Sequence, residues 1–227
     1  MDARPKVCLG MPVLQVVPGR EFYSHLRVAG ELTVVADWIC PPALNMTPYS
    51  NARNAIMERA VEQECDLVYF VDIDNRVPAG AFNRLWAMMQ ESAAAVVAGY
   101  YSKRCYPFGP TWLGDWGSRW ADDKPVPLLG CGMGCTLIDL KWLQEHVDPY
   151  PPLEHQSPGR EPRVRWFEEP PGGGTEDYPF CRKVLAAGGV VVGHPQVVCG
   201  HKVEAPPVTA ANEELYRRLC EMPVADG

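Results

Sequence analysis

The chain has 227 residues, of which 47% are hydrophobic and 22% charged. This balance is typical of a folded globular protein and excludes a disordered or fibrous one. The formal net charge of −7 argues against a general electrostatic attraction to nucleic acid, although it is compatible with a local basic patch. No apolar run approaches the roughly 18 residues of a membrane span, and the N-terminal stretch does not resemble a signal peptide. We therefore expect one domain over residues 1–227, a cytoplasmic location and no association with a membrane.

Nine cysteines are scattered along the chain, and an odd number cannot all pair as disulfides. Most lie inside apolar runs, which is typical of reduced thiols in a protein core. A sharper alternative is a zinc site formed by Cys131, Cys135, Cys199 and His201. No closely spaced Cys-x2-Cys pair occurs, so we expect free thiols rather than zinc.

Short apolar runs alternate with helical patterns through the first hundred residues. This alternation predicts an α/β protein with a mostly parallel central sheet flanked by helices. The clearest strand is Leu-Val-Tyr-Phe-Val, which ends at Asp72. In chain order, strands are predicted at 7–11, 32–36, 67–71 and 94–101.

Two helices are predicted between these strands. Ser50 is a candidate N-cap for a helix over 51–63, and Pro78 opens the second helix. Their inner faces are defined by apolar residues at helical spacing: Ala52, Ile56 and Ala60 in the first, and Phe82, Leu85, Trp86 and Met89 in the second.

The second half is less regular. Residues 102–128 and 147–174 are rich in Pro, Gly, Trp and charge, as functional loops often are. Thr175 is a candidate cap for a helix that ends at two glycines, 188 and 189. The remaining predicted elements are a strand at 130–139, a helix at 140–147, strands at 190–192 and 196–199, and a tail helix at 212–221.

Asp72 and Asp74 stand at the carboxyl end of the clearest strand. Ligands of open α/β sheets bind outside such strand ends. Two carboxylates in an Asp-x-Asp arrangement can hold a hard divalent cation and leave positions open for phosphate oxygens. Taken alone, the same residues are also typical of a turn that stops a strand.

Further motifs follow in an order that resembles the metal-dependent GT-A-fold glycosyltransferases of the Asp-x-Asp type, in particular their small soluble branch from phages and bacteria. The resemblance spans roughly residues 5–203. It is carried by Ser50-Asn51-Ala52-Arg53-Asn54, Asp72-Ile73-Asp74, the glycine-rich run Gly130 to Ile138, Trp166-Phe167, Thr175-Glu176-Asp177, and Cys199-Gly200-His201-Lys202.

This resemblance implies a GT-A fold and an inverting glycosyltransferase that uses Mn²⁺ or Mg²⁺ and a nucleotide-sugar donor such as UDP-glucose. It implies a nucleotide-sugar-binding half over 1–101, an acceptor half over 102–205 and a helical tail over 206–227. The implied donor-binding residues are Pro12, Arg53, Asp72, Asp74, Gly132 and Lys202. The implied metal ligands are Asp72, Asp74 and His201, and the implied catalytic residues are Asp177 as general base and Glu176 as its orienting neighbour.

The acceptor is less defined than the donor. Trp112, Trp116, Trp120 and Trp166 offer aromatic faces that suit sugars or bases, but they also suit a core that anchors loops. Arg160, Arg163 and Arg165 form a candidate basic patch, with Lys103 and Arg104 as possible additions. Phage relatives that glucosylate hydroxymethylated DNA bases make modified DNA an alternative to a saccharide acceptor.

Two other functions are compatible with parts of this pattern. A nucleotidyltransferase also places acidic pairs at strand ends, but Gly10-Met11-Pro12 lacks the basic residue expected of a triphosphate loop. A non-catalytic module that binds zinc or a nucleotide is the third reading. Finally, the three glycines at 172–174 suggest a mobile lid over the donor.

Overall fold

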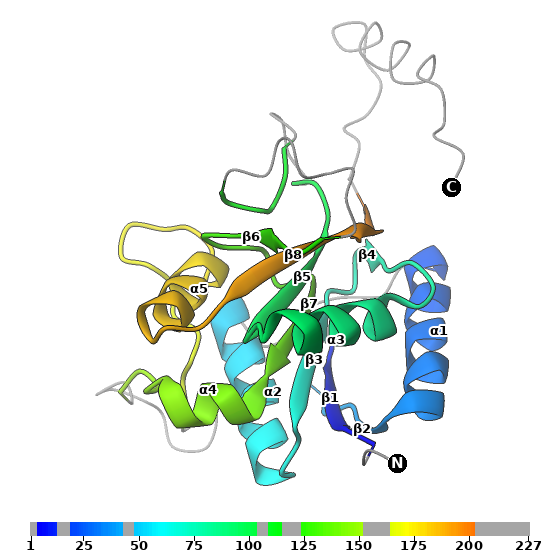
Figure 1. The fold of residues 1–227 in the computed structure, drawn as a ribbon, viewed down its shortest axis with the longest axis horizontal. Helices are drawn as coiled ribbons and strands as arrows, with labels where there is room; N and C mark the ends of the chain where they lie inside the picture. The colour runs from blue at the N-terminus through cyan, green and yellow to red at the C-terminus, as the bar shows by residue number, and fades with distance from the viewer. Residues whose placement is uncertain are drawn as a thin grey trace, which may run out of the picture.

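A computed structural model describes residues 4–12, 19–42, 48–103, 109–114, 124–151 and 164–202. Its centre is a seven-stranded sheet (Figure 1). In spatial order the strands are β2 (Asp37–Ile39), β1 (Lys6–Gly10), β3 (Leu67–Val71), β7 (Cys135–Asp139), β5 (Val96–Tyr100), β8 (Val191–Val198) and β6 (Val126–Pro127). Strands β7 and β6 run opposite to the other strands, so the sheet is mostly parallel. A short antiparallel ribbon of β4 (Asn75–Arg76) and β9 (Gly200–His201) stands beside it.

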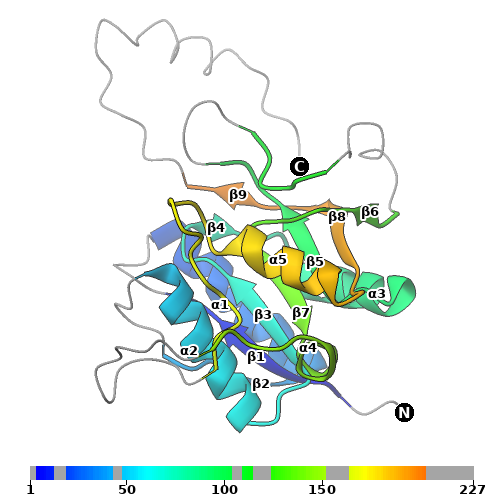
Figure 2. The same cartoon turned by 90° about the vertical axis from the view of Figure 1, so that its left-hand side faces the viewer.

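Helices cover both faces of the sheet. They are α1 (Gly19–Val35), α2 (Tyr49–Glu62), α3 (Ala81–Ser92), α4 (Leu140–His146) and α5 (Asp177–Ala186). Helices α2, α4 and α5 lie on one face and α1 and α3 on the other, as Figure 2 shows from the side. The α/β class and the flanked, mostly parallel sheet are therefore confirmed.

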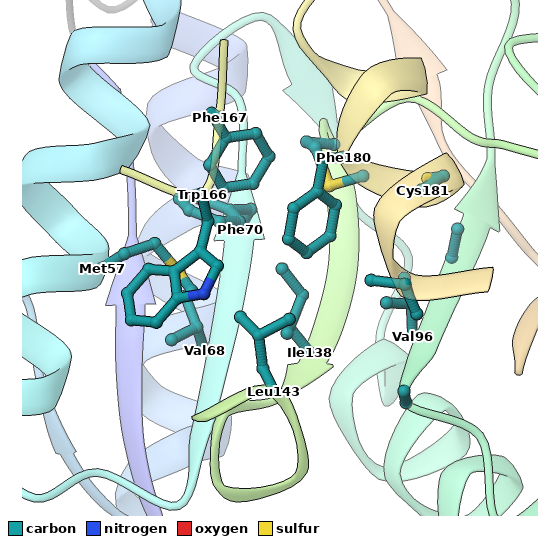
Figure 3. Packing of buried hydrophobic residues seen from close by; sticks show 14 of the residues in the cluster. Met57, Val68, Phe70, Val96, Ile138, Leu143, Trp166, Phe167, Phe180 and Cys181 are labelled. Atoms are coloured by element: carbon teal, nitrogen blue, oxygen red, sulfur yellow. The ribbon is translucent and has the colours of Figure 1, made fainter. Parts of the chain in front are cut away.

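Strand β3 is buried on both sides because its side chains alternate between two cores. Val68 and Phe70 belong to the cluster under α2, α4 and α5, whereas Tyr69 belongs to the cluster under α1 and α3. In the first cluster the Phe167 ring stacks on Phe180, with centroids 4.4 Å apart, and meets the Phe70 ring edge to face (Figure 3). The strand that ends at Asp72 is thus held rigidly between two layers of helices.

Two expected strands differ from the structure. The strand predicted at 32–36 is wrong, because α1 continues through Val35 and the strand, β2, begins only at Asp37. Val28 and Leu32 are one helical turn apart and both buried, while Val34 is 76% exposed. Their burial on one helical face outweighs the strand preference of the β-branched residues nearby. The two strands expected at 190–192 and 196–199 are mostly one continuous strand, β8.

The helix caps and the glycine-rich run also differ from the predictions. Ser50 lies inside α2, whose N-cap is Pro48, and Thr175 precedes the N-cap of α5, Glu176. In the run expected at 130–139, only Cys135–Asp139 forms a strand. The predicted helices at 51–63, after Pro78 and at 140–147 are confirmed to within a few residues. The tail helix at 212–221 lies outside the described residues.

Asn54 ties α2 to the segment that brings Trp166 and Phe167 into the core. Its Oδ1 accepts hydrogen bonds from the backbone N–H groups of both residues, each at 2.9 Å, and its Nδ2 donates to the carbonyl of Phe167 at 2.8 Å. Asn54 is 1% exposed. One side chain therefore provides hydrogen-bond partners for three buried backbone groups that lie outside any strand.

Replacing Asn54 with alanine should destabilise the protein by about 2–4 kcal/mol, because buried backbone groups would lose their partners. Urea unfolding followed by circular dichroism measures this loss. Asn83→Ala, at an exposed position of α3, is the matched control and should change the free energy of unfolding by less than about 0.5 kcal/mol. Equal stabilities of the two variants would contradict this role of Asn54.

Candidate functional site

The candidate site begins where β3 ends. The backbone N–H of Asp72 donates to the carbonyl of Gly134 at 3.0 Å, and the N–H of Asn75 donates to the carbonyl of Asp72 at 3.0 Å. These bonds turn the chain directly after the strand, so that Asp72 and Asp74 lie at its carboxyl end. This is the edge at which α/β sheets bind ligands.

The ribbon of β4 and β9 brings His201 to Asp74. Asn75 pairs with His201 in the ribbon, and the backbone N–H of Lys202 donates to the carbonyl of Asp74 at 2.8 Å. As a result, Nε2 of His201 lies 3.5 Å from Oδ2 of Asp74. The structure thus brings together two residues that the sequence analysis assigned to a metal.

The surroundings of Nδ1 determine the tautomer of His201. Nδ1 lies 2.6 Å from the carbonyl oxygen of Ser102, which can only accept a hydrogen bond. Nδ1 therefore carries the proton, and in the neutral ring Nε2 presents its lone pair toward Asp74. This arrangement suits an imidazole that binds a metal, because the second nitrogen is held by a hydrogen bond.

Arg53 connects the strand end to the start of α5. Its side chain is only 3% exposed. Nη1 lies 3.2 Å from Oδ1 of Asp72, while Nε lies 2.7 Å from Oε1 of Glu176 and 3.6 Å from Oδ1 of Asp177. The predicted pairing of Arg53 with Asp72 is therefore present. One buried guanidinium holds three carboxylates, which leaves an excess of negative charge in this cluster if all three are ionised.

Burial and this excess charge act on the ionisation of the cluster. Burial raises the pKa of Asp177 well above its usual range, although the positive charge of Arg53 opposes the shift; the nearby carboxylates of Glu176 and Asp72 raise the pKa further. Burial alone would lower the pKa of Arg53, but the surrounding carboxylates raise it well above its ordinary value. Asp177 is therefore a stronger base than an exposed aspartate, and Arg53 stays charged.

Three atoms of this cluster lack a well-formed hydrogen bond to any described residue. They are Nη1 of Arg53, Oδ1 of Asp72 and Oδ1 of Asp177. Nη1 and the Asp72 oxygen are close enough for an ion pair, but their hydrogen-bonding capacity is not used. Buried polar atoms usually have partners, so unused capacity at this point suits a ligand or an ordered water.

The glycines of the run at 130–134 lie against other side chains of the protein. A Cβ at Gly130 would lie 2.7 Å from the Tyr178 ring, and one at Gly132 would lie 2.2 Å from the Tyr101 hydroxyl. At Gly134 a Cβ would lie 2.1 Å from Nδ2 of Asn75. These glycines make room for side chains of the protein itself. The contact of Gly132 with a donor stays a prediction.

Among the described residues, no group of three or more His, Cys, Asp or Glu side chains is placed to hold a metal ion. Asp72 pairs with Arg53, whereas Asp74 and His201 lie next to each other. The role of Asp72 as a third metal ligand stays a prediction. A carboxylate and an imidazole are suitable ligands for Mn²⁺, and a cation held this way has positions left for phosphate oxygens and water. The donor set therefore fits an open site that a substrate completes.

A zinc site is not favoured by the cysteines. Every described cysteine is free, and all except Cys40 are buried. Sγ of Cys131 lies 3.8 Å from Sγ of Cys181, which is not one of the four candidate ligands. The expectation of free thiols is confirmed for the described residues.

The predicted acceptor residues are core residues where the structure describes them. Trp112 and Trp166 are each 3% exposed, and their indole N–H groups donate to the carbonyls of Gly99 and Val147. Arg165 is 7% exposed and donates to the carbonyl of Pro151 at 2.7 Å. Of the two alternatives, these three residues therefore take the one in which they anchor the irregular half. Trp116, Trp120, Arg104, Arg160 and Arg163 lie outside the described residues.

The remaining predicted residues lie near the strand ends. Pro12 is buried two residues after β1, and the side chains of Lys103 and Lys202 are exposed. The glycines at 172–174 all have positive φ, so their backbone requires glycine. Motion of a lid at this turn stays a prediction.

Sequence reasoning missed two side chains beside the site. The Tyr101 hydroxyl accepts a hydrogen bond from the N–H of Gly134 at 2.8 Å, and its ring meets the His201 ring edge to face. His25 of α1 lies with Nε2 3.2 Å from the carbonyl oxygen of Asp72. Neither residue belongs to a motif, so only the fold reveals them.

Comparison with protein-family models and with curated proteins finds no match. Solved structures do match. Protein A197 from STIV is 16% identical, with a TM-score of 0.57, over 88% of this chain and 86% of its own. GalNAc-T7, solved with UDP, GalNAc and Mn²⁺, is 10% identical, with a TM-score of 0.53, over 97% of this chain and 48% of its own. At these identities the similarity concerns the fold, and it supports the expected GT-A-like architecture.

Within the part of the chain that the structure describes, no helix has the length and apolar character needed to cross a membrane.

Replacing Arg53 with glutamine should destabilise the protein by roughly 3–5 kcal/mol, because three carboxylates would lose their buried counter-charge. The pKa of Asp177 is raised in the folded state. At pH values between the ordinary aspartate pKa and this raised pKa, folding takes up a proton, so the stability of the protein falls as the pH rises through that range. Arg53 lowers the pKa of Asp177, so its removal raises that pKa further and makes the ionised carboxylate more costly. The loss should therefore be larger at about pH 8, where the carboxyl has to ionise, than at about pH 5.

Urea unfolding at both pH values measures this effect. Arg59→Gln is the matched control, because Arg59 is 54% exposed on the same helix and pairs with Glu62. The control should cost less than about 1 kcal/mol at either pH. A cost as small in Arg53→Gln would refute the role of Arg53 as the counter-charge.

Proposed function

We propose that this protein is a metal-dependent glycosyltransferase that moves a sugar from a nucleotide sugar, most simply a UDP-sugar, to an acceptor hydroxyl. The observation that carries the proposal is the meeting of Asp74 and His201 at the end of β3, with Arg53 linking that strand end to Asp177. The fold shared with GalNAc-T7, a structure that contains UDP, GalNAc and Mn²⁺, supports it at the level of architecture.

In this proposal Asp74 and His201 hold Mn²⁺ or Mg²⁺. The cation supplies neutralisation of the charge that develops on the departing diphosphate. Asp72 keeps its ion pair with Arg53 and faces the donor nucleotide. Pro12, Gly132 and Lys202 complete the proposed donor contacts, since their segments adjoin the strand ends or lie directly beside Asp74.

Asp177 is the proposed general base, with Glu176 fixing Arg53 beside it. Transfer with inversion requires a base that takes the proton of the attacking hydroxyl on the side opposite the diphosphate. The raised pKa of Asp177 favours this role, because a more basic carboxylate accepts a proton more readily. The acceptor is proposed as a saccharide or a hydroxymethylated DNA base.

Asp74→Ala should abolish manganese-dependent binding of UDP while the protein stays folded, because Asp74 follows β3 and lies outside the core. Thermal shift with UDP and UDP-sugars, with and without manganese, measures this binding. Wild-type protein with ligand at a hundred times its dissociation constant should gain about 2.7 kcal/mol of stability. His201→Ala should weaken metal binding less, since a neutral ligand is lost.

Two results would count against this proposal. One is the absence of a metal-dependent shift in the wild-type protein with every nucleoside diphosphate tested. The other is unchanged manganese dependence in Asp74→Ala.

Asp177→Asn should bind the metal and diphosphate nearly as well as the wild-type protein, yet transfer sugar about 10²–10⁴-fold more slowly. The reason is that asparagine keeps the shape of the side chain but cannot accept the proton. Turnover is measured by release of UDP, and the anomer of the product by NMR. Wild-type turnover in this variant, or a product with retained configuration, would remove Asp177 as an inverting base.

A further inference from the structure

A pocket lies between the β4–β9 ribbon and the first turns of α1. It has a volume of about 430 Å³ and is lined by Arg27, Arg76, Tyr23 and Val198, among others. Arg76 pairs with Gly200 in the ribbon, one step from the pair of Asn75 and His201. Because successive side chains of a strand point to opposite faces, the pocket and the metal pair lie on different sides of the ribbon.

A hydrogen bond fixes Arg27, whereas Arg76 lies against the backbone of Gly200. Arg27 donates from Nη2 to the carbonyl of Val77, the residue next to Arg76. Val77 is itself fixed by Ser24, whose Oγ accepts from the Val77 N–H at 2.9 Å. The Arg76 guanidinium lies on Gly200, where a Cβ would come within 3.1 Å of Nε. The absence of a side chain at Gly200 therefore leaves room for this position of Arg76.

The nearby carboxylates do not use the hydrogen-bonding capacity of the two arginines. Glu31 lies 3.8 Å from Nε of Arg27, and Glu21 lies 3.9 Å from Nε of Arg76, both longer than a hydrogen bond. The Glu31 carboxylate instead accepts from the N–H of Gly80 at 3.1 Å. Arg76 donates no hydrogen bond to any described residue, and its side chain is 55% exposed.

We propose that this pocket binds a phosphate group. Glu31 and Glu21 each lie within ion-pair distance of one of the two arginines, but neither accepts a hydrogen bond from it. A phosphate has several acceptor oxygens and close to two negative charges near neutral pH, so it can use the free N–H donors of both guanidinium groups in place of these carboxylates. Tyr23, which is 74% exposed at the rim, offers a ring face to whatever carries the phosphate. The inference concerns a site separate from the proposed donor site and does not depend on the proposed function.

Titration with inorganic phosphate tests this inference. The protein is kept in EDTA, which removes divalent ions, and chloride at equal ionic strength is the reference. Thermal shift or calorimetry should show saturable phosphate binding to the wild-type chain. Arg76→Gln and Arg27→Gln should each weaken it about tenfold or more, because each removes a charge-assisted contact. Arg59→Gln is the control, since Arg59 is exposed to nearly the same extent as Arg76 but lies on α2.

Asp74→Ala separates this inference from the proposed function. It should keep phosphate binding in EDTA while losing manganese-dependent binding of UDP. Arg76→Gln is the decisive variant if Arg27→Gln fails to fold, because Arg76 makes no described hydrogen bond that folding would miss. Absence of saturable phosphate binding in the wild-type protein would overturn the inference, as would an equal loss in Arg59→Gln.

Discussion

The candidate site depends on one buried positive charge. The guanidinium of Arg53 lies between the end of β3 and the start of α5, and it contacts carboxylates from both. Without a cation at this point, three acidic side chains would face one another in a region of low polarity, where like charges repel strongly. The position of α5 against the sheet, and with it the position of Asp177, therefore follows from an electrostatic requirement as well as from packing.

The same arrangement explains why α2 is so constrained. Arg53 and Asn54 are neighbours in α2, yet they serve different parts of the molecule: one meets the acidic cluster, and the other holds the backbone at Trp166 and Phe167. Ala52 and Ile56 of the same helix are fully buried in the core. Within two turns, α2 therefore provides core side chains, the hydrogen bonds of Asn54 and the positive charge of Arg53. A shift of the helix would disturb all of these contacts.

The sequence alone predicted the parts of the fold that depend on strong local patterns. Strand β3 and the helix after Pro78 were identified because their apolar residues repeat at a clear spacing. The proximity of Asp74 and His201 was anticipated only from the resemblance in the order of motifs. The sequence around each residue gives no indication that the two lie close together. The β2 region was misassigned because Thr33, Val34 and Val35 favour strands locally, whereas the burial of one face of α1 is decided by the tertiary structure.

The roles of the glycines and tryptophans also depend on tertiary contacts that the local sequence does not show. A glycine shows that space is needed, but the sequence does not say what fills it, and here Tyr101, Tyr178 and Asn75 do. Trp112 and Trp166 are typical of sugar-binding surfaces by composition, yet both are packed in the core with their indole N–H groups bonded to carbonyls. Residue type alone does not show which distant residue a side chain contacts, because that depends on the tertiary structure.

The ribbon that joins Asp74 to His201 has a consequence for folding. Asp74 comes early in the chain and His201 late, and the strands between them include β5, β7 and β8, which form the far half of the sheet. Closing a loop of this length costs entropy before any contact compensates for it, so the pair is a contact of the long-range kind that slows folding. A nascent or truncated chain that lacks β9 has only one of the two side chains, so the candidate site depends on the last described strand.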